Sequence, residues 1–485
     1  MTETTASPAS HRVSTAEMQR IFNLQQKHQY IVARTTAKQR IAKLRRLHDV
    51  MLRERQEVAQ AVWEDLRKCP TETNISELGV VNGEIRHAIR NLQSWMTPKQ
   101  VATPMVLFGT SSEIMYEPKG VCLVLSPWNF PFNLTLSPLV SAVAAGNCVI
   151  VKPSEYAPAS AAVMKKIVAE CFPPEEVALF EGDADVAQAL LKMPFNHVFF
   201  TGSPAVGKIV MREAANHLAS ITLELGGKNP TIVDETADLD TAAAKIAWLK
   251  VMNAGQSCIA PDYVLAHESI HDRLAEKIVL KIKEFYGETP ETRRESPDMC
   301  RIIHGRHFAR LKSLLDDAVL HGSNIALGGK TDAATRFMEP TVLTHVPEEA
   351  VIWGEETFGP ILLLRPYRTL DEAIGYINQH PRPLAMYLWS ASRRNINYTL
   401  SETRNGDVTV NDCGTHFYNS NLPFGGINNS GIGKTHGEFG FLEFTNARGV
   451  VRQNRIFPLT NLFLPPYRKH SGLVRWMLEG VVKWF

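Results

Sequence analysis

The sequence predicts an α/β protein built from two doubly wound domains. Short β-rich runs alternate with helical patterns from Gly120 onward. A first set of runs reads GVCLVLS, NCVIVKP, EVALFEG, HVFFTG, ITLELGG and PTIVD, and a second reads DYVLAH, ILLLRPY, AMYLWS and GDVTVN. Alternation of strands and helices is typical of a parallel sheet with helices on both faces. A chain of 485 residues is long enough for two such domains.

The segment before Gly120 has a different composition and periodicity. Residues 1–14 are rich in Thr, Ser and Ala and contain no apolar run, so they predict a disordered arm and not a secretory signal. Residues 15–66 have helical periodicity, clearest at four apolar positions: Ile41, Leu44, Leu47 and Met51. An amphipathic helical region therefore precedes the first predicted sheet.

Composition excludes several classes of function. The net charge of +2 and the lack of a recognisable motif give no reason to expect nucleic-acid binding. No stretch reaches the roughly 18 uninterrupted apolar residues of a membrane-spanning helix. Seven cysteines without a CxxC spacing argue against a disulfide framework, and sixteen histidines show no metal-ligand spacing. We expect a cytoplasmic protein in a reducing compartment, without a metal site.

A turn between a strand and a helix is a first candidate binding site. In HVFFTGSPAVGK, Gly202 follows the strand, Ser203 is suited to cap the next helix, and Pro204 suits its first turn. A helix N-terminus in this position can receive a phosphate group. The spacing from Gly202 to Gly207 is not GxGxxG, however, so these residues alone also fit an ordinary turn.

Two other predicted strand ends carry charged side chains. In VIVKPSE, Lys152 ends a strand and Glu155 follows it, where the pair could grip the hydroxyl groups of a ribose or remain solvated. In LELGGKNP, Glu224 lies in an apolar strand just before a glycine pair. A carboxylate in a poorly solvated cleft has a raised pKa and can act as a base. The alternative is a structural carboxylate that binds the backbone of Gly226 and Gly227.

The segment MNAGQSCIAP contains the cysteine with the least ordinary surroundings. Cys258 lies between a glycine hinge and Pro261, which is an odd place for a buried structural thiol. The loop SPWNFPFN offers a side-chain amide donor at Asn129, although a turn-forming Asn is the simpler explanation of that residue alone. Each of these signals is modest by itself.

Together the motifs resemble those of the aldehyde dehydrogenase superfamily over nearly the whole chain. They occur in the order PWNFP, VKPSE, FTGSPAVG, LELGGKNP, GQSCIAPD, EETFGP and LPFGG. GQSCIAPDY and the short N-terminus resemble the class 3 and fatty-aldehyde branch. The chain departs from many relatives at Ser203–Pro204, where they carry Ser-Thr or Ser-Glu, and backbone groups would bind the phosphate there. The resemblance implies a Rossmann-like cofactor domain, a catalytic domain and a small β segment for oligomerisation.

The resemblance also implies a mechanism. Cys258 would be the nucleophile that attacks the aldehyde carbon, and the resulting oxyanion would be stabilised by the backbone N–H of Cys258 and the side-chain amide of Asn129. One such donor contributes on the order of 3 kcal/mol. Hydride transfer to NAD, or to NADP as an alternative cofactor, would leave a thioester on Cys258. Glu224 would then activate the water that hydrolyses it. The glycine hinge would let the backbone approach the substrate.

The same matching assigns residues to the cofactor. Lys152 and Glu155 would hold the adenine ribose, and a carboxylate at Glu155 favours NAD over NADP because it would repel a 2′-phosphate. The pyrophosphate and nicotinamide side would be lined by Gly202, Ser203, Gly207 and Gly226. The nicotinamide ribose would be held by Glu356 and Phe358 of EETFGP. Asn411, Asp412 and the segment from Leu422 are expected near the substrate tunnel.

The implied division of the chain has five parts: a disordered arm at 1–14, a cofactor-binding domain at 15–225 with a bridging segment near 98–118, a catalytic domain at 226–430, a return and oligomerisation segment at 431–460, and an amphipathic tail at 461–485. We expect a homodimer. The tail is predicted to be helical from Leu473 to Phe485, with one polar stripe of Arg475, Glu479 and Lys483. It would dock on the enzyme's own body, cover the substrate tunnel, or make peripheral contact with a membrane.

An apolar aldehyde is the expected substrate, of medium or long aliphatic chain or aromatic. The tunnel candidates that suggest it are Trp128, Phe132, Tyr418 and Phe424. Two rival functions remain: an acylating enzyme that passes the acyl group to coenzyme A, and a non-catalytic scaffold with the same fold. Glu224 argues against the first because transfer to coenzyme A needs no base for hydrolysis. Cys258 and Glu224 together argue against the second.

Overall fold

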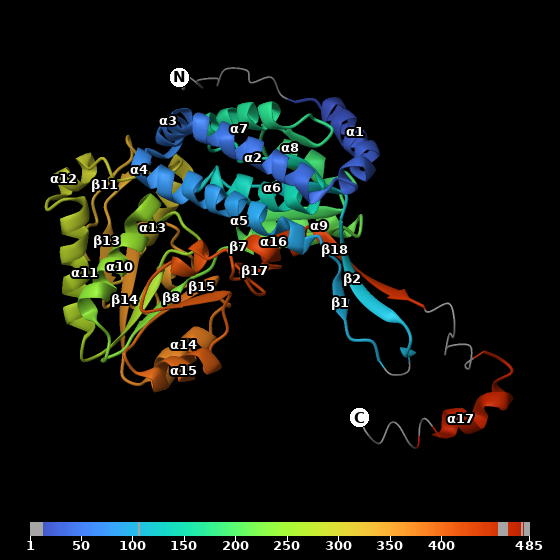
Figure 1. The fold of residues 1–485 in the computed structure, drawn as a ribbon. Helices are drawn as coiled ribbons and strands as arrows, with labels where there is room; N and C mark the ends of the chain where they lie inside the picture. The colour runs from blue at the N-terminus through green and yellow to red at the C-terminus, as the bar shows by residue number, and fades with distance from the viewer. Residues whose placement is uncertain (1–12, 105–106, 454–463, 477–478, 480–485) are drawn as a thin grey trace.

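Two helix-covered sheets form the body of the protein, and a narrow third sheet extends from it (Figure 1). The structure is a computed structural model, and it describes residues 13–104, 107–453, 464–476 and 479. The first sheet has the strand order β17-β7-β6-β3-β4-β5, and β17 is its antiparallel member. Its strands are β3 (Val121–Leu125), β4 (Cys148–Lys152), β5 (Val177–Leu179), β6 (His197–Gly202), β7 (Ser220–Leu225) and β17 (Gly431–Ile432).

Helices cover both faces of this sheet, as the continuous apolar character of its strands requires. Along β3, Cys122 and Val124 join one hydrophobic core, and Val121, Leu123 and Leu125 join another on the opposite face. The first core includes residues of α2 (Ala37–Arg53), α3 (Arg55–Leu66), α5 (Gly79–Trp95), α6 (Asn133–Ala145) and α7 (Pro158–Cys171). The second includes residues of α1 (Thr15–Ala33), α8 (Ala184–Leu191) and α9 (Pro204–Ala215).

The second sheet has the strand order β10-β13-β14-β9-β8-β15-β16, with β10 antiparallel at one edge. Its strands are β8 (Pro230–Val233), β9 (Tyr263–His267), β10 (Asn324–Leu327), β13 (Thr341–Thr344), β14 (Ile361–Tyr367), β15 (Ala385–Trp389) and β16 (Asp407–Val410). One face packs on α10 (Leu239–Val251) and α11 (His271–Tyr286), and the other on α13 (Gly305–Leu320) and α14 (Leu370–Asn378). The predicted α/β class with two doubly wound sheets is therefore confirmed.

Shorter elements join and cap the two sheets. The first sheet's flank includes α4 (Pro70–Thr73), the π-helix η1 (Asn74–Leu78) and α16 (Gly437–Glu443). Around the second sheet lie η3 (Met252–Gly255), α12 (Pro290–Glu295), β11 (Thr331–Asp332), β12 (Phe337–Met338), η4 (Val351–Trp353), α15 (Arg393–Glu402) and η5 (Thr415–Tyr418). The chain leaves the first sheet at Leu225 and enters the second at Pro230, near the predicted boundary. The five predicted chain divisions themselves stay a prediction.

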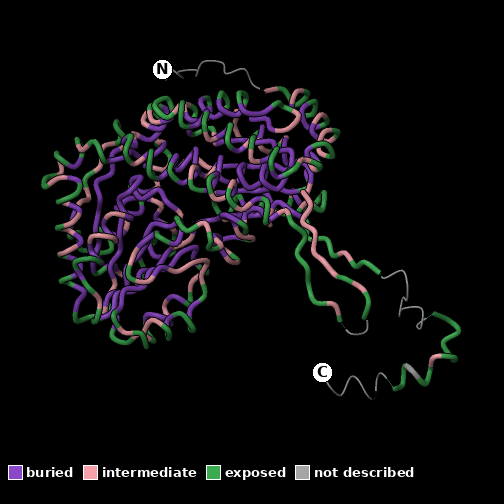
Figure 2. Tube along the Cα trace, viewed as in Figure 1, coloured by how far each residue is buried: buried purple, intermediate pink, exposed green. Residues whose placement is uncertain are grey.

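The third sheet is a three-stranded antiparallel ribbon that stands away from the body (Figures 1 and 2). It consists of β1 (Lys99–Val101), β2 (Ser111–Pro118) and β18 (Thr445–Arg452), in the order β1-β2-β18. Its strands come from the predicted bridging segment and from the predicted return segment, and residues of β1 and most of β18 are exposed. The ribbon thus presents two uncovered strand edges to the surroundings.

The two chain ends differ in how they are tied down. Ser14 caps α1 by accepting a hydrogen bond from the Glu17 N–H at 3.1 Å, and residues 1–12 of the predicted arm lie outside the described residues. At the other end, η7 (Tyr467–His470) and α17 (Ser471–Trp476) lie apart from the body. Arg475 donates to Glu479 at 2.8 Å, as the predicted polar stripe requires, whereas Lys483 lies outside the described residues. Among the described helices none is long and apolar enough to cross a membrane.

Candidate active site

The turn that carries Cys258 follows α10 and has an unusual backbone. Asn253 and Ala254 have φ angles of 53° and 52°, and Gly255 has a φ of 72°, all in the left-handed region. A Cβ atom at Gly255 would lie 2.2 Å from the carbonyl oxygen of Gly359. The prediction that this glycine lets the backbone approach the substrate stays a prediction, and the structure adds a second reason for a glycine at this position. Gly255 is required because the turn packs against another part of its own backbone.

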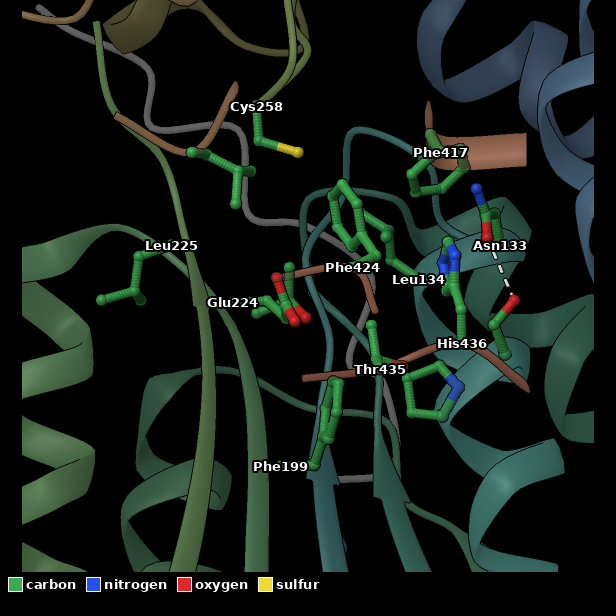
Figure 3. A pocket seen from close by; sticks show the side chains of 14 residues that line it. Asn133, Leu134, Phe199, Glu224, Leu225, Cys258, Phe417, Phe424, Thr435 and His436 are labelled. Atoms are coloured by element: carbon green, nitrogen blue, oxygen red, sulfur yellow. Dashed lines mark hydrogen bonds between the residues drawn. The ribbon is translucent and has the colours of Figure 1, made fainter. Parts of the chain in front are cut away.

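The Cys258 thiol differs from the other six cysteines. It is partly exposed, whereas the remaining thiols are buried. Figure 3 shows its sulfur at a cavity that also receives the Glu224 carboxylate. Burial raises the pKa of the Cys258 thiol to about 12, and the charges of Glu224 and Glu356 contribute in the same direction. The thiol is therefore neutral at physiological pH in this state, and it needs a proton acceptor before it can act as a nucleophile.

Asn129 is fixed directly beside the Cys258 turn. Its side-chain Nδ2 donates to the carbonyl oxygen of Gln256 at 3.1 Å, and its own carbonyl accepts from the Asn253 side chain at 2.8 Å. Asn129 lines the same cavity as Cys258. The simpler explanation of Asn129 as a turn former does not account for these contacts. Because Nδ2 carries two hydrogens, one donor remains beside the bond to Gln256.

A fully buried ion pair contacts the backbone carbonyl of Asn129. The Lys68 Nζ lies 2.7 Å from Glu77 Oε1 and donates to the Asn129 carbonyl at 3.3 Å. The other carboxylate oxygen of Glu77 accepts from the backbone N–H groups of Phe132 and Asn133, at 3.1 and 3.0 Å, at the start of α6. Glu77 lies in η1, and π-helical turns of this kind are frequent at functional sites. No sequence pattern indicated this pair: Lys68 lies in the short connection between α3 and α4, and Glu77 lies in η1.

Glu224 is a buried carboxylate without a partner. Neither of its carboxylate oxygens has a hydrogen-bond partner among the described residues. Burial raises the pKa of Glu224 well above its ordinary value, and Lys434 opposes that shift. The alternative in which Glu224 binds the backbone of Gly226 and Gly227 is wrong, because neither oxygen of Glu224 accepts a hydrogen bond from either glycine. The environment of Glu224 thus favours its protonated form more than water does, and the ionised form can serve as a proton acceptor.

The largest space at this site is a cavity of about 320 Å³ on one side of Cys258. It brings together eight of the predicted site residues: Asn129, Gly202, Ser203, Glu224, Gly226, Cys258, Glu356 and Phe358. A Cβ atom at Gly226 would lie 2.4 Å from Glu356 Oε2, so only glycine lets this carboxylate reach the cavity wall. Two strand ends and a capped helix N-terminus form the walls of this cavity. Dinucleotides usually bind at this position in sheets of this kind.

The other predicted cofactor residues lie next to this cavity or beyond it. Ser203 caps α9 by accepting from the Val206 N–H at 3.4 Å. Gly207 lies one turn further, where a Cβ would stand 2.9 Å from a Leu225 methyl, so this glycine permits close packing of helix on strand. At the end of β4, Lys152 Nζ lies 2.9 Å from Glu155 Oε2. The carboxylate of this pair is about one third exposed and so remains accessible to a ligand.

Helix α13 holds the loop that carries Glu356 and Phe358. The Arg310 guanidinium donates to the carbonyls of Glu356 and Thr357, and His307 Nε2 lies 2.9 Å from the Phe358 carbonyl. Burial lowers the pKa of His307 to about 4, so the ring is neutral and donates this bond. Burial also raises the pKa of Glu356 to about 8. Sequence reasoning missed His307 and Arg310, although the polar pattern HGRHFAR was a possible signal.

The opposite side of Cys258 has only small cavities, of about 30 and 20 Å³. Two of the predicted tunnel residues line them: Phe424 the first and Tyr418 the second. The prediction was wrong for Phe132, which is fully buried in the core, and for Trp128, which faces the large cavity 5.6 Å from the Phe358 ring. The expected neighbours Asn411 and Asp412 instead bond to Ser390 and Lys245, respectively.

Comparison with known proteins places this arrangement in a family. Residues 4–450 match the model of the aldehyde dehydrogenase family. The 4,4'-diaponeurosporen-aldehyde dehydrogenase of Staphylococcus aureus is 41% identical over 85% of this chain and 88% of its own. Aldehyde dehydrogenase family 3 member B1 of Rattus norvegicus is 40% identical over 90% of this chain and 92% of its own. Similarity to family 3 confirms the branch that the sequence predicted.

A solved structure agrees with this fold over nearly the full length. The structure titled as the substrate-bound state of Staphylococcus aureus AldH has a TM-score of 0.90 and 38% identity, over 95% of this chain and 99% of that one. The chain therefore belongs to the aldehyde dehydrogenase family and is an NAD(P)-dependent aldehyde dehydrogenase.

Proposed function

We propose that the protein oxidises an apolar aldehyde to its carboxylate through a thiohemiacetal and a thioester on Cys258, and that Glu224 activates the hydrolytic water. One observation carries the proposal: the unpartnered carboxylate of Glu224 and the Cys258 thiol line one cavity of about 30 Å³. A space of that size holds a water molecule. A base, a nucleophile and room for water are the parts that hydrolysis of a thioester needs.

The first half of the reaction forms a bond between Cys258 Sγ and the aldehyde carbon. The ionised form of Glu224, which shares a cavity with Cys258, accepts the thiol proton as the thiolate forms, and it releases that proton to solvent before the second half of the reaction. The free N–H of the Asn129 amide and the backbone N–H of Cys258 donate to the oxyanion. When bound, the nicotinamide supplies the acceptor for the hydride that leaves the carbon. The contribution of this chain is to hold Asn129 in place and to keep bulk water away.

The second half breaks the Cys258–carbon bond. The ionised Glu224 takes a proton from water, the hydroxide adds to the thioester carbonyl, and the thiolate of Cys258 leaves as the carboxylate forms. An acylating enzyme would need no such base, so the Glu224 cavity favours hydrolysis over transfer to coenzyme A. Product analysis with and without coenzyme A distinguishes the two. Formation of an acyl-coenzyme A product at the expense of carboxylate would overturn the hydrolytic proposal.

The dinucleotide is proposed to lie along the large cavity and the β4 end. Gly202, Ser203 and Gly226 offer backbone surface without side-chain bulk, and Glu356 and Phe358 lie on the opposite wall. Lys152 and Glu155 are then placed to bind the hydroxyls of the adenine ribose. A carboxylate at Glu155 repels a 2′-phosphate, so we propose that NAD is preferred and that NADP is a weaker alternative.

The substrate is proposed to be a medium- or long-chain aliphatic aldehyde or an aromatic one. The small cavities opposite the cofactor side are lined mainly by apolar side chains, including Phe130, Leu134, Phe417 and Phe424. The name of the Staphylococcus aureus relative gives 4,4'-diaponeurosporen-aldehyde as the aldehyde on which that enzyme acts. Each buried methylene contributes about 0.8 kcal/mol, or roughly fourfold in catalytic efficiency.

A panel of aldehydes tests this substrate class. Catalytic efficiency should rise from propanal through hexanal to decanal, and benzaldehyde should be accepted. Succinic semialdehyde serves as the control because its carboxylate would have to enter an apolar space without a partner. Equal efficiency for the charged and the long apolar aldehyde would contradict the proposal.

The ribbon and the tail are proposed to mediate contacts beyond the substrate. The exposed edges of the ribbon suit pairing between two copies, which supports a homodimer. In the tail, Leu464, Tyr467 and Trp476 are exposed among basic residues, a composition that suits peripheral membrane contact of a cytoplasmic enzyme. The exposure of these three side chains argues against docking of the tail on its own subunit. Co-sedimentation with anionic liposomes, for the full chain and for a chain ending at Tyr467, tests the membrane contact.

A further inference from the structure

A second pocket, lined by charged side chains, lies between α3, α12 and the segment around Arg336. It has a volume of about 740 Å³. We name it the arginine pocket after four of the side chains that line it: Arg67, Arg294, Arg301 and Arg336. Two acidic residues, Glu64 and Glu295, also line it. The arginine pocket shares no lining residue with the cavities around Cys258.

Three of the four guanidinium groups have no ion-pair partner among the described residues. Arg294 pairs with Asp332 at 2.5 Å, but Arg67, Arg301 and Arg336 have no carboxylate oxygen within 4.0 Å. Arg67 lies over the Trp63 ring at 5.5 Å, and Arg336 donates to the Ile303 carbonyl at 2.9 Å. The contacts of Arg67 and Arg336 named here are to neutral groups, and four arginines against two glutamates give the lining of the arginine pocket a net positive charge.

Arg301 is the most informative of the three because it is only 5% exposed. Its Nη1 donates to the carbonyls of Met299 and Cys300 at 2.9 and 3.2 Å, and its Nη2 donates to the Arg294 carbonyl at 2.7 Å. A buried charge without a counter-charge is unfavourable, and carbonyl dipoles offset that cost only in part. An anion in the pocket would supply the missing counter-charge.

We propose that the arginine pocket binds a small polyanion that bears two or more phosphate or carboxylate groups. Guanidinium groups are planar donors that bind such groups in bidentate fashion. Arginines on three separate segments of the wall can contact several anionic groups of one molecule. They cannot all contact a single small ion equally well. This site goes beyond the proposed oxidation, since it takes neither the aldehyde nor the dinucleotide.

The pocket is joined to the catalytic turn by one short segment, 301–303. The Arg301 carbonyl accepts from the Gln256 side chain at 3.0 Å, and the Ile303 N–H donates to the same side chain at 2.9 Å. On the pocket side, the Ile302 N–H donates to the Arg336 carbonyl at 3.2 Å. Gln256 precedes Cys258 by two positions, and its carbonyl holds Asn129. A polyanion that fixes Arg301 and Arg336 therefore acts on the segment that positions the nucleophile.

Inorganic pyrophosphate is the probe for the first test, measured by calorimetry with saturating NAD so that the dinucleotide site is filled. The variant is the double substitution Arg67→Gln with Arg336→Gln, because both side chains are only partly buried. Arg368→Gln, an exposed arginine paired with Glu268, removes one positive charge elsewhere and is the control. We expect pyrophosphate to bind at least tenfold more weakly to the double variant and unchanged to the control. Equal affinity in all three proteins, or no binding to the wild type, would overturn the proposal.

The second test measures the coupling without relying on turnover. The rate at which iodoacetamide alkylates Cys258, followed by mass spectrometry of the intact chain, should change at least twofold when pyrophosphate is added to the wild type. The double variant should show no such change, while its aldehyde oxidation in the absence of pyrophosphate shows that it is folded. An alkylation rate that pyrophosphate leaves unaltered in the wild type would contradict the link through 301–303.

Discussion

The two sides of Cys258 differ in both size and chemistry. On the side proposed for the cofactor, the cavity measures about 320 Å³ and is lined by glycine backbone, a helix terminus and the Glu356 carboxylate. On the other side the cavities measure about 30 and 20 Å³ and are walled mainly by apolar side chains. A preformed space with fixed polar groups suits one unvarying ligand. A tight apolar space suits a substrate chain that displaces or rearranges flexible side chains, and it leaves room for one water molecule beside Glu224.

The two buried carboxylates, Glu356 and Glu224, differ in a similar way. Burial raises the pKa of Glu356 to about 8, and the backbone N–H of Gly227 opposes that shift. Glu224 has no hydrogen-bond partner among the described residues, and its pKa is raised well above the ordinary value. A carboxylate with a fixed donor is suited to hold a ligand hydroxyl, whereas one without a donor is free to exchange a proton. Substitutions that affect one side of Cys258 but not the other therefore test the division.

The largest effect is expected at the residue that both sides share. Cys258→Ser should reduce aldehyde oxidation by more than about a thousandfold, because a hydroxyl is a far weaker nucleophile than a thiolate. NAD affinity, measured by fluorescence quenching, should stay near that of the wild type because the thiol is only one edge of the large cavity. Substantial turnover by the variant would show that the nucleophile is elsewhere.

Glu224→Gln should separate the two half-reactions. We expect steady-state turnover to fall by roughly 10² to 10⁴, the usual range for loss of a general base. If acylation uses another route for the thiol proton, a burst of reduced cofactor should precede a slow steady state, and mass spectrometry should find the acyl group on Cys258. An unchanged steady-state rate would contradict the role of Glu224 as the base for hydrolysis.

The pH profile gives an independent view of the same carboxyl. Because the pKa of Glu224 is raised, the carboxyl is protonated and inactive as a base at low pH, and turnover should increase as the pH rises through that pKa. The residual turnover of Glu224→Gln should lack this limb. A wild-type rate that is flat from pH 5 to pH 9 would argue against proton abstraction by Glu224.

Strand positions and the reactive turn could be predicted from the sequence because they depend on local pattern. Apolar runs such as CVIVK mark buried parallel strands, and the motif around Cys258 predicts by resemblance that this residue is the nucleophile. The contacts of Lys68 with Glu77 and of His307 with Phe358 could not be predicted, because the first depends on how the chain turns between α3 and η1 and the second joins residues 51 positions apart. The aromatic residues near the site predicted an apolar pocket. They did not predict on which side of Cys258 that pocket lies, which explains the error at Trp128.

The unpredicted pair beneath Asn129 gives the next prediction. Lys68→Met should lower turnover by about 10- to 100-fold, because the Asn129 carbonyl loses a donor and the amide loses its fixed position. It should also lower the free energy of unfolding by about 3–5 kcal/mol, since Glu77 is left as an uncompensated buried charge.

A second variant separates the two consequences of Lys68→Met. Adding Glu77→Gln removes the buried charge and should recover much of the lost stability in denaturant titrations, while turnover should remain low. If stability and turnover recover together, Lys68 has only a structural role and does not position Asn129.

The smallest effect is expected far from the thiol, at the β4 end of the cofactor side. Glu155→Gln removes a charge that would repel a 2′-phosphate, and it also removes the partner that lies 2.9 Å from Lys152 Nζ. The ratio of catalytic efficiency with NAD to that with NADP should fall by up to about tenfold, and aldehyde selectivity should not change. Glu181→Gln is the matched control, because Glu181 pairs with Lys165 on the same domain at 2.7 Å without a predicted cofactor role. A wild type that prefers NADP, or a ratio that falls equally in both variants, would contradict the assignment of Glu155 to the ribose.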